Sequence, residues 1–185
     1  MMWKSLVTCM ALAVVFGATS PVEAEVTVGF DAQDSVIDLA IVDTVEVNII
    51  ADFTLPIIAW GLDLTIETPG IASLIDVEIN SSLWDWVYTP DGDGLAGLAP
   101  IPTVVGPGVD FVLATLTFHG DAIGVTPISL SYTLIPPDET EGFAKHPTGF
   151  DEVIWYEEGT ITVIPEPGTL SVLALGGLAL LRRRG

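Results

Sequence analysis

The chain has 185 residues, of which 25 are acidic and only five are Lys or Arg, so its formal net charge is −20 at pH 7. A field of this sign repels the phosphates of nucleic acids and anionic lipids, which excludes nucleic-acid binding as a function. Cys9 is the only cysteine and lies in a leader that we expect to be removed, so the mature protein is expected to have no disulfide and no thiol chemistry. Its stability must then come from an apolar core.

The N-terminus has the three parts of a secretory signal peptide. Lys4 precedes an apolar run from Leu6 to Ala18, and Val22-Glu23-Ala24 supplies small or permissive residues before a cleavage site between Ala24 and Glu25. The run is too short for a membrane span. A lipoprotein signal ending at Cys9 is disfavoured, because almost no apolar region precedes this cysteine. We therefore predict a signal peptide over residues 1–24 and export of the chain.

Residues 25–164 are predicted to form one domain, which is long enough to bury a full core. Of the 25 acidic residues only Glu23 and Glu166 lie outside it, and its one basic residue is Lys145, so its net charge is about −22. Such a charge favours divalent cations or basic partners. The alternative is that the charge serves only solubility outside the cell or in a salty medium.

Alternating apolar and polar residues predict β-strands throughout this domain. Breakers separate the runs at Thr68-Pro69-Gly70, Gly106-Pro107-Gly108 and Ile135-Pro136-Pro137. Eight or nine short strands with such turns favour an all-β fold, an antiparallel β-sandwich or jelly roll. The alternating rows are Val45, Val47 and Ile49; Leu62, Leu64 and Ile66; Ile75, Val77 and Ile79; Val112, Ala114, Leu116 and Phe118; and Ile128, Leu130, Tyr132 and Leu134, with further strands expected at 26–28, 153–156 and 160–163.

The order of these features resembles a cohesin-type domain, the nine-stranded jelly roll that binds dockerins in cellulosomes. The resemblance covers most of residues 26–163, and a long insertion between Tyr88 and Asp110 departs from a compact family member. It implies a protein-binding or scaffolding role, although a fold alone does not fix a function. The segments that carry it are Thr44-Val45-Glu46-Val47, Trp60-Gly61-Leu62-Asp63-Leu64, Leu113-Ala114-Thr115-Leu116-Thr117-Phe118 and Gly124-Val125-Thr126-Pro127-Ile128-Ser129-Leu130.

The segment Asp91-Gly92-Asp93-Gly94 is a candidate start of a calcium-binding loop, because alternating carboxylates and glycines let oxygen atoms converge on a hard cation. An EF-hand loop needs a Glu at its twelfth position, where Pro102 stands. A turn between strands uses the same residue types. Asp91 and Asp93 are the calcium ligands to test, and no other cofactor is expected.

Trp84, Trp86 and Tyr88 alternate along one face of an extended segment, and such a row is a candidate platform for sugar rings. The alternative is packing in the core or across strands, where aromatic residues are common. Trp60 and Trp155 are expected in the core for the same reason.

No catalytic residue is predicted. His119 and His146 are the only histidines, one at the end of an expected strand and the other in a polar loop, and neither has a nucleophile and an orienting partner at a recognisable spacing. A pair of carboxylates that could cleave glycosides is expected by chance among so many acids. The sequence has no Gly-rich phosphate loop, Cys/His metal cluster or nucleophile elbow.

The C-terminus has three parts in order: Pro165-Glu166-Pro167, an uncharged apolar segment from Gly168 to Leu181, and Arg182-Arg183-Arg184. As a helix the apolar segment spans roughly 21 Å, which is less than the about 30 Å of a bilayer core. The arginines are expected at the cytoplasmic interface. The alternative, a terminal helix docked on the domain, would have no polar face.

This tail, residues 165–185 with a predicted transmembrane segment at 168–181, resembles the PEP-CTERM sorting signal of exported bacterial proteins. The resemblance implies processing by an exosortase-type membrane protease and a cell-surface or extracellular destination, often associated with biofilm polysaccharide. The tail is expected to hold the protein in the membrane either transiently or permanently.

Together these features predict an exported, non-enzymatic protein of the cell surface or the biofilm matrix. Its cohesin-like sandwich would bind a protein or a polysaccharide ligand. The competing hypothesis is a secreted carbohydrate-binding protein or a weak glycosidase.

Overall fold

The computed structural model describes residues 25–84, 95–100, 102–132, 141–147, 149, 152–155, 158–166 and 168. The regular elements with defined bounds in these residues are all strands, which confirms the all-β prediction. They are β1 (Glu25–Phe30), β2 (Asp34–Asp38), β3 (Thr44–Phe53), β4 (Ile57–Gly61), β5 (Asp63–Ile66), β6 (Ala72–Ile79), β7 (Ala96–Leu98), β8 (Gly108–Gly120), β9 (Gly124–Ser131), β10 (Gly142–Lys145), β11 (Glu152–Trp155) and β12 (Gly159–Ile164).

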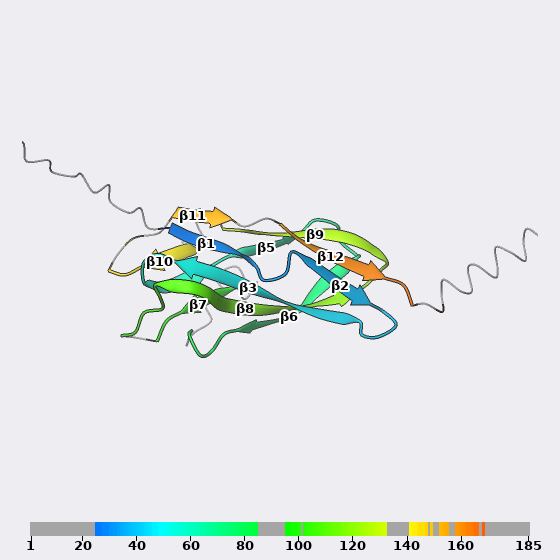
Figure 1. Ribbon diagram of the computed structural model, residues 1–185, viewed down its shortest axis with the longest axis horizontal. Helices are drawn as coiled ribbons and strands as arrows, with labels where there is room; N and C mark the ends of the chain where they lie inside the picture. Colours follow the sequence, from blue (N-terminus) through cyan, green and yellow to red (C-terminus); the bar gives the residue numbers. More distant parts are fainter. Residues whose placement is uncertain are drawn as a thin grey trace, which may run out of the picture.

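The strands form two layers around one core (Figure 1). One layer is a five-stranded sheet in the order β11-β1-β3-β8-β6. The other contains the sheets β2-β12-β9-β5 and β10-β4-β7, and only Leu62 separates β4 from β5 along the chain. Both layers contribute buried side chains to the same cluster, so the fold is the predicted β-sandwich.

Two strand pairs are parallel, whereas the sequence predicted an antiparallel sandwich. β1 pairs with β11, and β2 pairs with β12, in parallel register, and the remaining pairs among the described strands are antiparallel. The first and last parts of the domain thus lie side by side in both layers. Such long-range pairing leaves no short-range signal in the sequence, since a parallel pair cannot be joined by a tight turn.

β3 and β8 are the longest strands and lie together in the five-stranded sheet, where Val47 pairs with Leu116. Their predicted alternation is confirmed, because Val47, Ile49, Ala114 and Leu116 are all fully buried. A register shift places Leu113 as an extra residue on β8, and Leu113 is also fully buried while Val112 is half-buried. The bulge therefore brings Leu113, which is not part of the predicted alternating row, into the core.

The prediction that Ile75 faces the core is wrong. A register shift lies between Leu74, which pairs with Phe118, and Asp76, which pairs with Thr117. Ile75 is the extra residue of this bulge, and its side chain is 56% exposed. Val77 and Ile79 follow the bulge and do face the core. Tyr132 lies just after β9, and Leu134 is outside the described residues.

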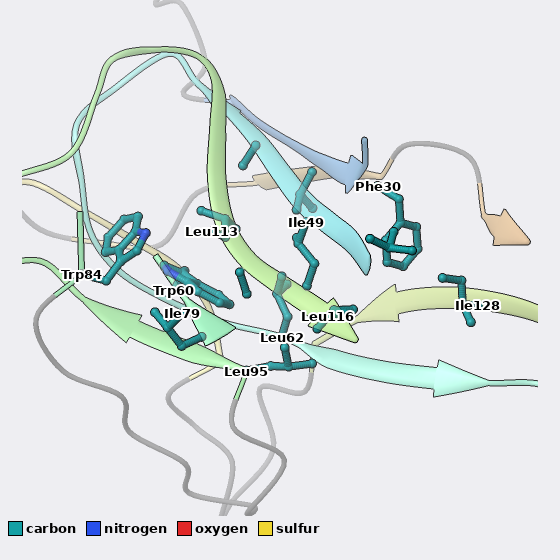
Figure 2. Close-up of a cluster of buried hydrophobic side chains, with 14 of the residues drawn as sticks. Phe30, Ile49, Trp60, Leu62, Ile79, Trp84, Leu95, Leu113, Leu116 and Ile128 are labelled. Atoms are coloured by element: carbon teal, nitrogen blue, oxygen red, sulfur yellow. The ribbon is translucent and has the colours of Figure 1, made fainter. Parts of the chain in front are cut away.

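The core contains large side chains from both layers (Figure 2). Phe53 stacks on Phe111 at a centroid distance of 5.2 Å and contacts Phe143 of β10 at 5.9 Å. Burying each large apolar side chain contributes roughly 1.5–3 kcal/mol. The buried residues that Figure 2 labels are Phe30, Ile49, Trp60, Leu62, Ile79, Trp84, Leu95, Leu113, Leu116 and Ile128.

Candidate functional site

The outer face of β3, β8 and β6 is a regular array of polar side chains. Antiparallel pairing places residues of the three strands in rows across the sheet, and alternate residues of each strand point outward. The rows are Glu46, Thr117 and Asp76; Asn48, Thr115 and Glu78; and Thr44, His119 and Ser73. We call these nine residues the polar grid; every one is exposed or half-buried.

Hydrogen bonds fix the centre of the polar grid. Asn48 donates its backbone N–H to Asp31 Oδ1 at 3.0 Å and its side-chain Nδ2 to Asp31 Oδ2 at 2.7 Å. Thr115 Oγ1 in turn donates to Asn48 Oδ1 at 2.7 Å. Asn48 is thus held on both sides. The result is an ordered polar surface with carboxylates at Glu46, Asp76 and Glu78.

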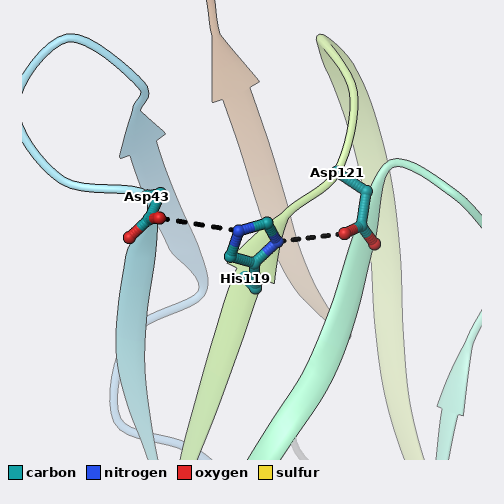
Figure 3. A network of polar contacts seen from close by, with 3 residues as sticks. All are labelled: Asp43, His119 and Asp121. Carbon is teal, nitrogen blue, oxygen red and sulfur yellow. Dashed lines mark hydrogen bonds and ion pairs between the residues drawn. The ribbon is translucent and has the colours of Figure 1, made fainter.

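One ionisable group of this face, His119 near the end of β8, contacts two carboxylates (Figure 3). Its Nδ1 lies 3.0 Å from Asp121 Oδ1, and its Nε2 lies 3.6 Å from Asp43 Oδ2. Asp43 directly precedes β3 and Asp121 directly follows β8. The imidazole therefore joins the turn before β3 to the turn after β8.

The pKa of Asp121 lies below its usual value of 3.8, chiefly because the carboxylate forms a hydrogen bond with His119. A second hydrogen bond, from Ser73, lowers the pKa further. Ser73 and His119 are paired across β6 and β8, so the sheet register brings this donor to the carboxylate. Asp121 is exposed, and water screens these interactions.

This cluster contains a serine, a histidine and two aspartates, but its connectivity is not that of a catalytic triad. In a triad the histidine contacts the nucleophile and a carboxylate orients the histidine from the other nitrogen. Here both ring nitrogens face carboxylates, and Ser73 bonds to Asp121. Ser73 is therefore directed to a carboxylate and not to the imidazole. The cluster is suited to holding two turns together.

Trp84, the first residue of the predicted glycan platform, is buried in the core with only 2% of its surface exposed. Its ring meets that of Trp60 edge to face, with centroids 6.1 Å apart (Figure 2). This is the packing alternative that the sequence left open for Trp84, and the core position expected for Trp60 is confirmed. Trp86 and Tyr88, the other two residues of the predicted platform, lie outside the described residues. The predicted calcium ligands Asp91 and Asp93 also lie outside them.

The predicted sorting features lie largely outside the described residues, including Ala24, Pro167 and Arg182, Arg183 and Arg184. Glu25, on the other side of the predicted cleavage site, is the first residue of β1, and Pro165 and Glu166 directly follow β12. Within the described part of the chain, no helix is long and apolar enough to cross a membrane.

The described residues contain no group of three or more His, Cys, Asp or Glu side chains placed to hold a metal ion.

Neither the polar grid nor the contacts of His119 could be predicted from the sequence. Asp43 and His119 are far apart along the chain, and only the pairing of Thr44 with His119 brings them together. The one usable signal was the position of His119 at the end of an alternating run, which correctly placed it at a strand end. The register between distant strands is required for the rest.

Solved structures share this fold. The CaCohA2 module of Clostridium acetobutylicum, solved in complex with a CaDoc0917 variant, is 19% identical with a TM-score of 0.53, and the alignment covers 76% of this chain and 99% of that chain. The fold is that of a cohesin. The sixth cohesin of scaffoldin B from Acetivibrio cellulolyticus, solved with a mutant Cel5 dockerin, is 14% identical with a TM-score of 0.51, covering 77% of this chain and 99% of that chain.

A third cohesin, the type III module of the cell-surface anchoring scaffoldin ScaE of Ruminococcus flavefaciens, is 14% identical with a TM-score of 0.50, and the alignment covers 79% of this chain and 90% of that chain. At these identities the likeness concerns the fold alone. No protein-family model matches the chain, and no curated protein matches it in sequence.

Proposed function

We propose that this protein is an exported, non-enzymatic surface or matrix protein whose cohesin-like domain binds a protein partner. The observation that carries the proposal is the fold, since cohesins of the same fold were solved in complex with CaDoc0917 and with a dockerin. The described surface adds an ordered polar grid, and the contacts of His119 are not those of a catalytic triad. A binding surface is therefore better supported than an active site.

The charge of the domain defines the chemistry of the partner. With 23 acidic residues and one lysine between residues 25 and 164, the domain attracts a basic protein surface. Long-range attraction of this kind raises the association rate and weakens as salt is added. We therefore propose a basic partner whose association rate falls as ionic strength rises.

The binding proposal is tested with a partner captured from the surface fraction of the native host, purified, and titrated against the domain. One triple variant reverses charge on the polar grid: Glu46→Lys, Asp76→Lys and Glu78→Lys. The matched control makes the same net charge change elsewhere with Asp34→Lys, Glu67→Lys and Glu158→Lys, all of which are exposed. Loss of affinity in one variant and not in the other identifies the binding face. Unchanged affinity in both variants rejects a charge-guided interface.

The proposed route to the surface rests on the two ends of the sequence, which have the form of a signal peptide and of a PEP-CTERM tail. In this route an exosortase-type protease processes the tail. Intact mass of the protein from surface and medium fractions is the test. A species that starts at Glu25 and ends near Pro165 supports processing at both ends. A species that retains Arg182-Arg183-Arg184 and occurs only in the inner membrane rejects release and identifies the tail as a resident anchor.

A glycan-binding role has less support. Of the three aromatic residues in the predicted platform, Trp84 is buried in the core, so the role would depend on Trp86 and Tyr88. Its test is tryptophan fluorescence during titration with the polysaccharide of the native host. A spectral shift that disappears in Trp86→Ala would favour a glycan ligand over a protein ligand.

A further inference from the structure

Two neighbouring turns at one end of the sandwich expose aliphatic side chains to solvent. Ile41 and Val42, between β2 and β3, are 82% and 49% exposed, and Ile123, between β8 and β9, is 57% exposed. We call these three residues the apolar tip. Transfer of each of these aliphatic side chains from water to an apolar environment is favourable. Exposed apolar clusters commonly mark contact surfaces.

Backbone hydrogen bonds hold both turns in place. In the first turn the N–H groups of Ile41 and Val42 donate to the carbonyl oxygen of Asp38 at 2.8 and 3.0 Å. In the second turn the N–H groups of Asp121 and Ala122 donate to the carbonyl oxygen of Ile71 at 2.9 and 3.2 Å. The apolar side chains are thus presented by ordered turns.

His119 ties these two turns to one another. Its ring contacts Asp43 of the first turn and Asp121 of the second (Figure 3). The backbone N–H of Gly120 also donates to the carbonyl oxygen of Asp43 at 2.9 Å. The parts of the apolar tip therefore keep a fixed arrangement and can act as one surface.

The chain leaves the domain at this same end. The N–H of Leu39 donates to the carbonyl oxygen of Ile164, the last residue of β12, and Val163 pairs with Gly124, the residue after Ile123. Figure 1 shows the end of β12 beside the β2–β3 turn, at the end of the sandwich opposite to the start of β1. The turns that carry the apolar tip thus lie beside the end of β12, from which the tail begins.

The length of the connection limits how far the tip can be from the tail. The uncharged apolar segment starts at Gly168, four residues after Ile164. Four extended residues span at most about 14 Å. If Gly168 to Leu181 lies in a bilayer with the three arginines on the cytoplasmic side, the end of the domain that carries Ile41, Val42 and Ile123 must lie at the outer surface of that bilayer.

We propose that the apolar tip inserts into the outer lipid interface while the tail is in the membrane, so that the domain stands on the bilayer with β12 at its base. This inference rests on the proposed function, because it needs the tail to occupy the membrane. Asp38, Asp43 and Asp121 lie on the same turns and repel anionic headgroups. Neutral phospholipid is therefore the partner that the tip fits, through apolar contact of the kind made by interfacial segments.

The experiment places single fluorophores on the mature form, residues 25–185, which has no cysteine of its own, with one new cysteine in each variant: Ile41→Cys, Ile123→Cys, Val109→Cys or Leu175→Cys. The protein is reconstituted in phosphatidylcholine vesicles whose acyl chains carry a nitroxide quencher close to the headgroup. Val109 is the matched control, because it is an aliphatic residue with 69% exposure at the opposite end of β8. Gly120 is eleven positions farther along this strand, a distance of about 36 Å.

The expected result is strong quenching at positions 41, 123 and 175 and little quenching at position 109. Quenching at 175 without quenching at 41 and 123 overturns the tip proposal and leaves membrane insertion of the tail intact. Equal quenching at 109 and at the tip also overturns it, since the domain would then have no preferred orientation. Absence of quenching at 175 rejects the membrane-inserted tail, and with it the tip. Contact between two copies of the protein would not quench, because the quencher is on the lipid.

Discussion

At the scale of single residues, Gly97 of β7 allows two tryptophans to pack together. A Cβ atom at this position would lie 2.6 Å from Trp60 Nε1 and 3.1 Å from Trp84 Cβ. Contacts this short force the rings or the strand to move, and overpacking of a core typically costs about 1–3 kcal/mol. We therefore expect Gly97→Ala to lower the free energy of unfolding by about this amount, measured by urea denaturation.

Trp60→Phe provides the matched test of that explanation. Phenylalanine lacks the Nε1 atom that the new Cβ would meet, so the double variant Gly97→Ala/Trp60→Phe should be more stable than the sum of the two single effects predicts. The indole N–H of Trp60 is buried and has no hydrogen-bond partner in the described structure, so its removal leaves no acceptor unpaired. Strictly additive effects would show that the loss in Gly97→Ala has another origin.

Asp121 makes a second residue-scale prediction, which concerns pH. Its pKa is lowered in the folded protein, so its contribution to stability is complete above the usual value of 3.8 and is lost as the pH falls from there through the folded pKa. The difference in unfolding free energy between the wild type and Asp121→Asn should therefore shrink as the pH is lowered below about 3.8. Urea denaturation over a series of pH values measures this difference.

The cause of the lowered pKa can be separated with two further variants. The hydrogen bond with His119 is the larger cause and that with Ser73 the smaller. An NMR titration of the Asp121 carboxyl should give a larger rise in its pKa in His119→Phe than in Ser73→Ala. The reverse order would mean that the contact between His119 and Asp121 in Figure 3 is not maintained in solution.

At the scale of elements, β8 is the central support of the five-stranded sheet. It pairs with β3 on one side and β6 on the other, and Leu116 in its middle is fully buried. Truncation of a fully buried leucine typically costs about 2–5 kcal/mol because it leaves a cavity. Leu116→Ala should cost this much in a denaturant titration. The exposed Val125→Ala on β9 is the control and should change stability by no more than about 0.5 kcal/mol.

The comparison of sequence and structure is also clearest at this scale. Alternation located β1, β3, β5, β6, β8, β9 and β12, and the apolar run 153–156 located β11. Alternation did not locate β2, β4, β7 and β10, because none of these four strands alternates apolar and polar residues. The bulge at Ile75 inverted one expected side chain, since an inserted residue depends on the partner strand and not on the local pattern.

The candidate surfaces could not be predicted in the same way. The polar grid and the contacts of His119 exist only once β3, β8 and β6 are in register. The apolar tip brings together turns from residues 39–43 and 121–123, and in the sequence Ile41 and Ile123 are ordinary aliphatic residues. Conversely, the order of motifs along the chain was enough to predict a cohesin-like fold, because core patterning is distributed over the whole domain.

At the scale of the whole molecule, the charge of the domain opposes its own compactness. Twenty-three acidic residues face a single lysine between residues 25 and 164, so repulsion among carboxylates must raise the free energy of the folded state. The Debye length falls from about 30 Å at 0.01 M salt to about 10 Å at 0.1 M. Added NaCl should therefore stabilise the domain by about 1 kcal/mol or more, a rise of roughly 4 °C in the midpoint of thermal unfolding measured by calorimetry.

Calcium chloride separates screening of this repulsion from binding at Asp91 and Asp93. Screening depends on ionic strength and valence, so calcium and magnesium at equal concentration should stabilise the domain equally. A ligand that binds only the folded state adds a further term that grows with the logarithm of its concentration. Extra stabilisation by calcium that Asp91→Asn/Asp93→Asn abolishes would therefore identify a calcium site in this loop. Equal effects of the two ions, retained in the double variant, would show that Asp91-Gly92-Asp93-Gly94 serves as a turn.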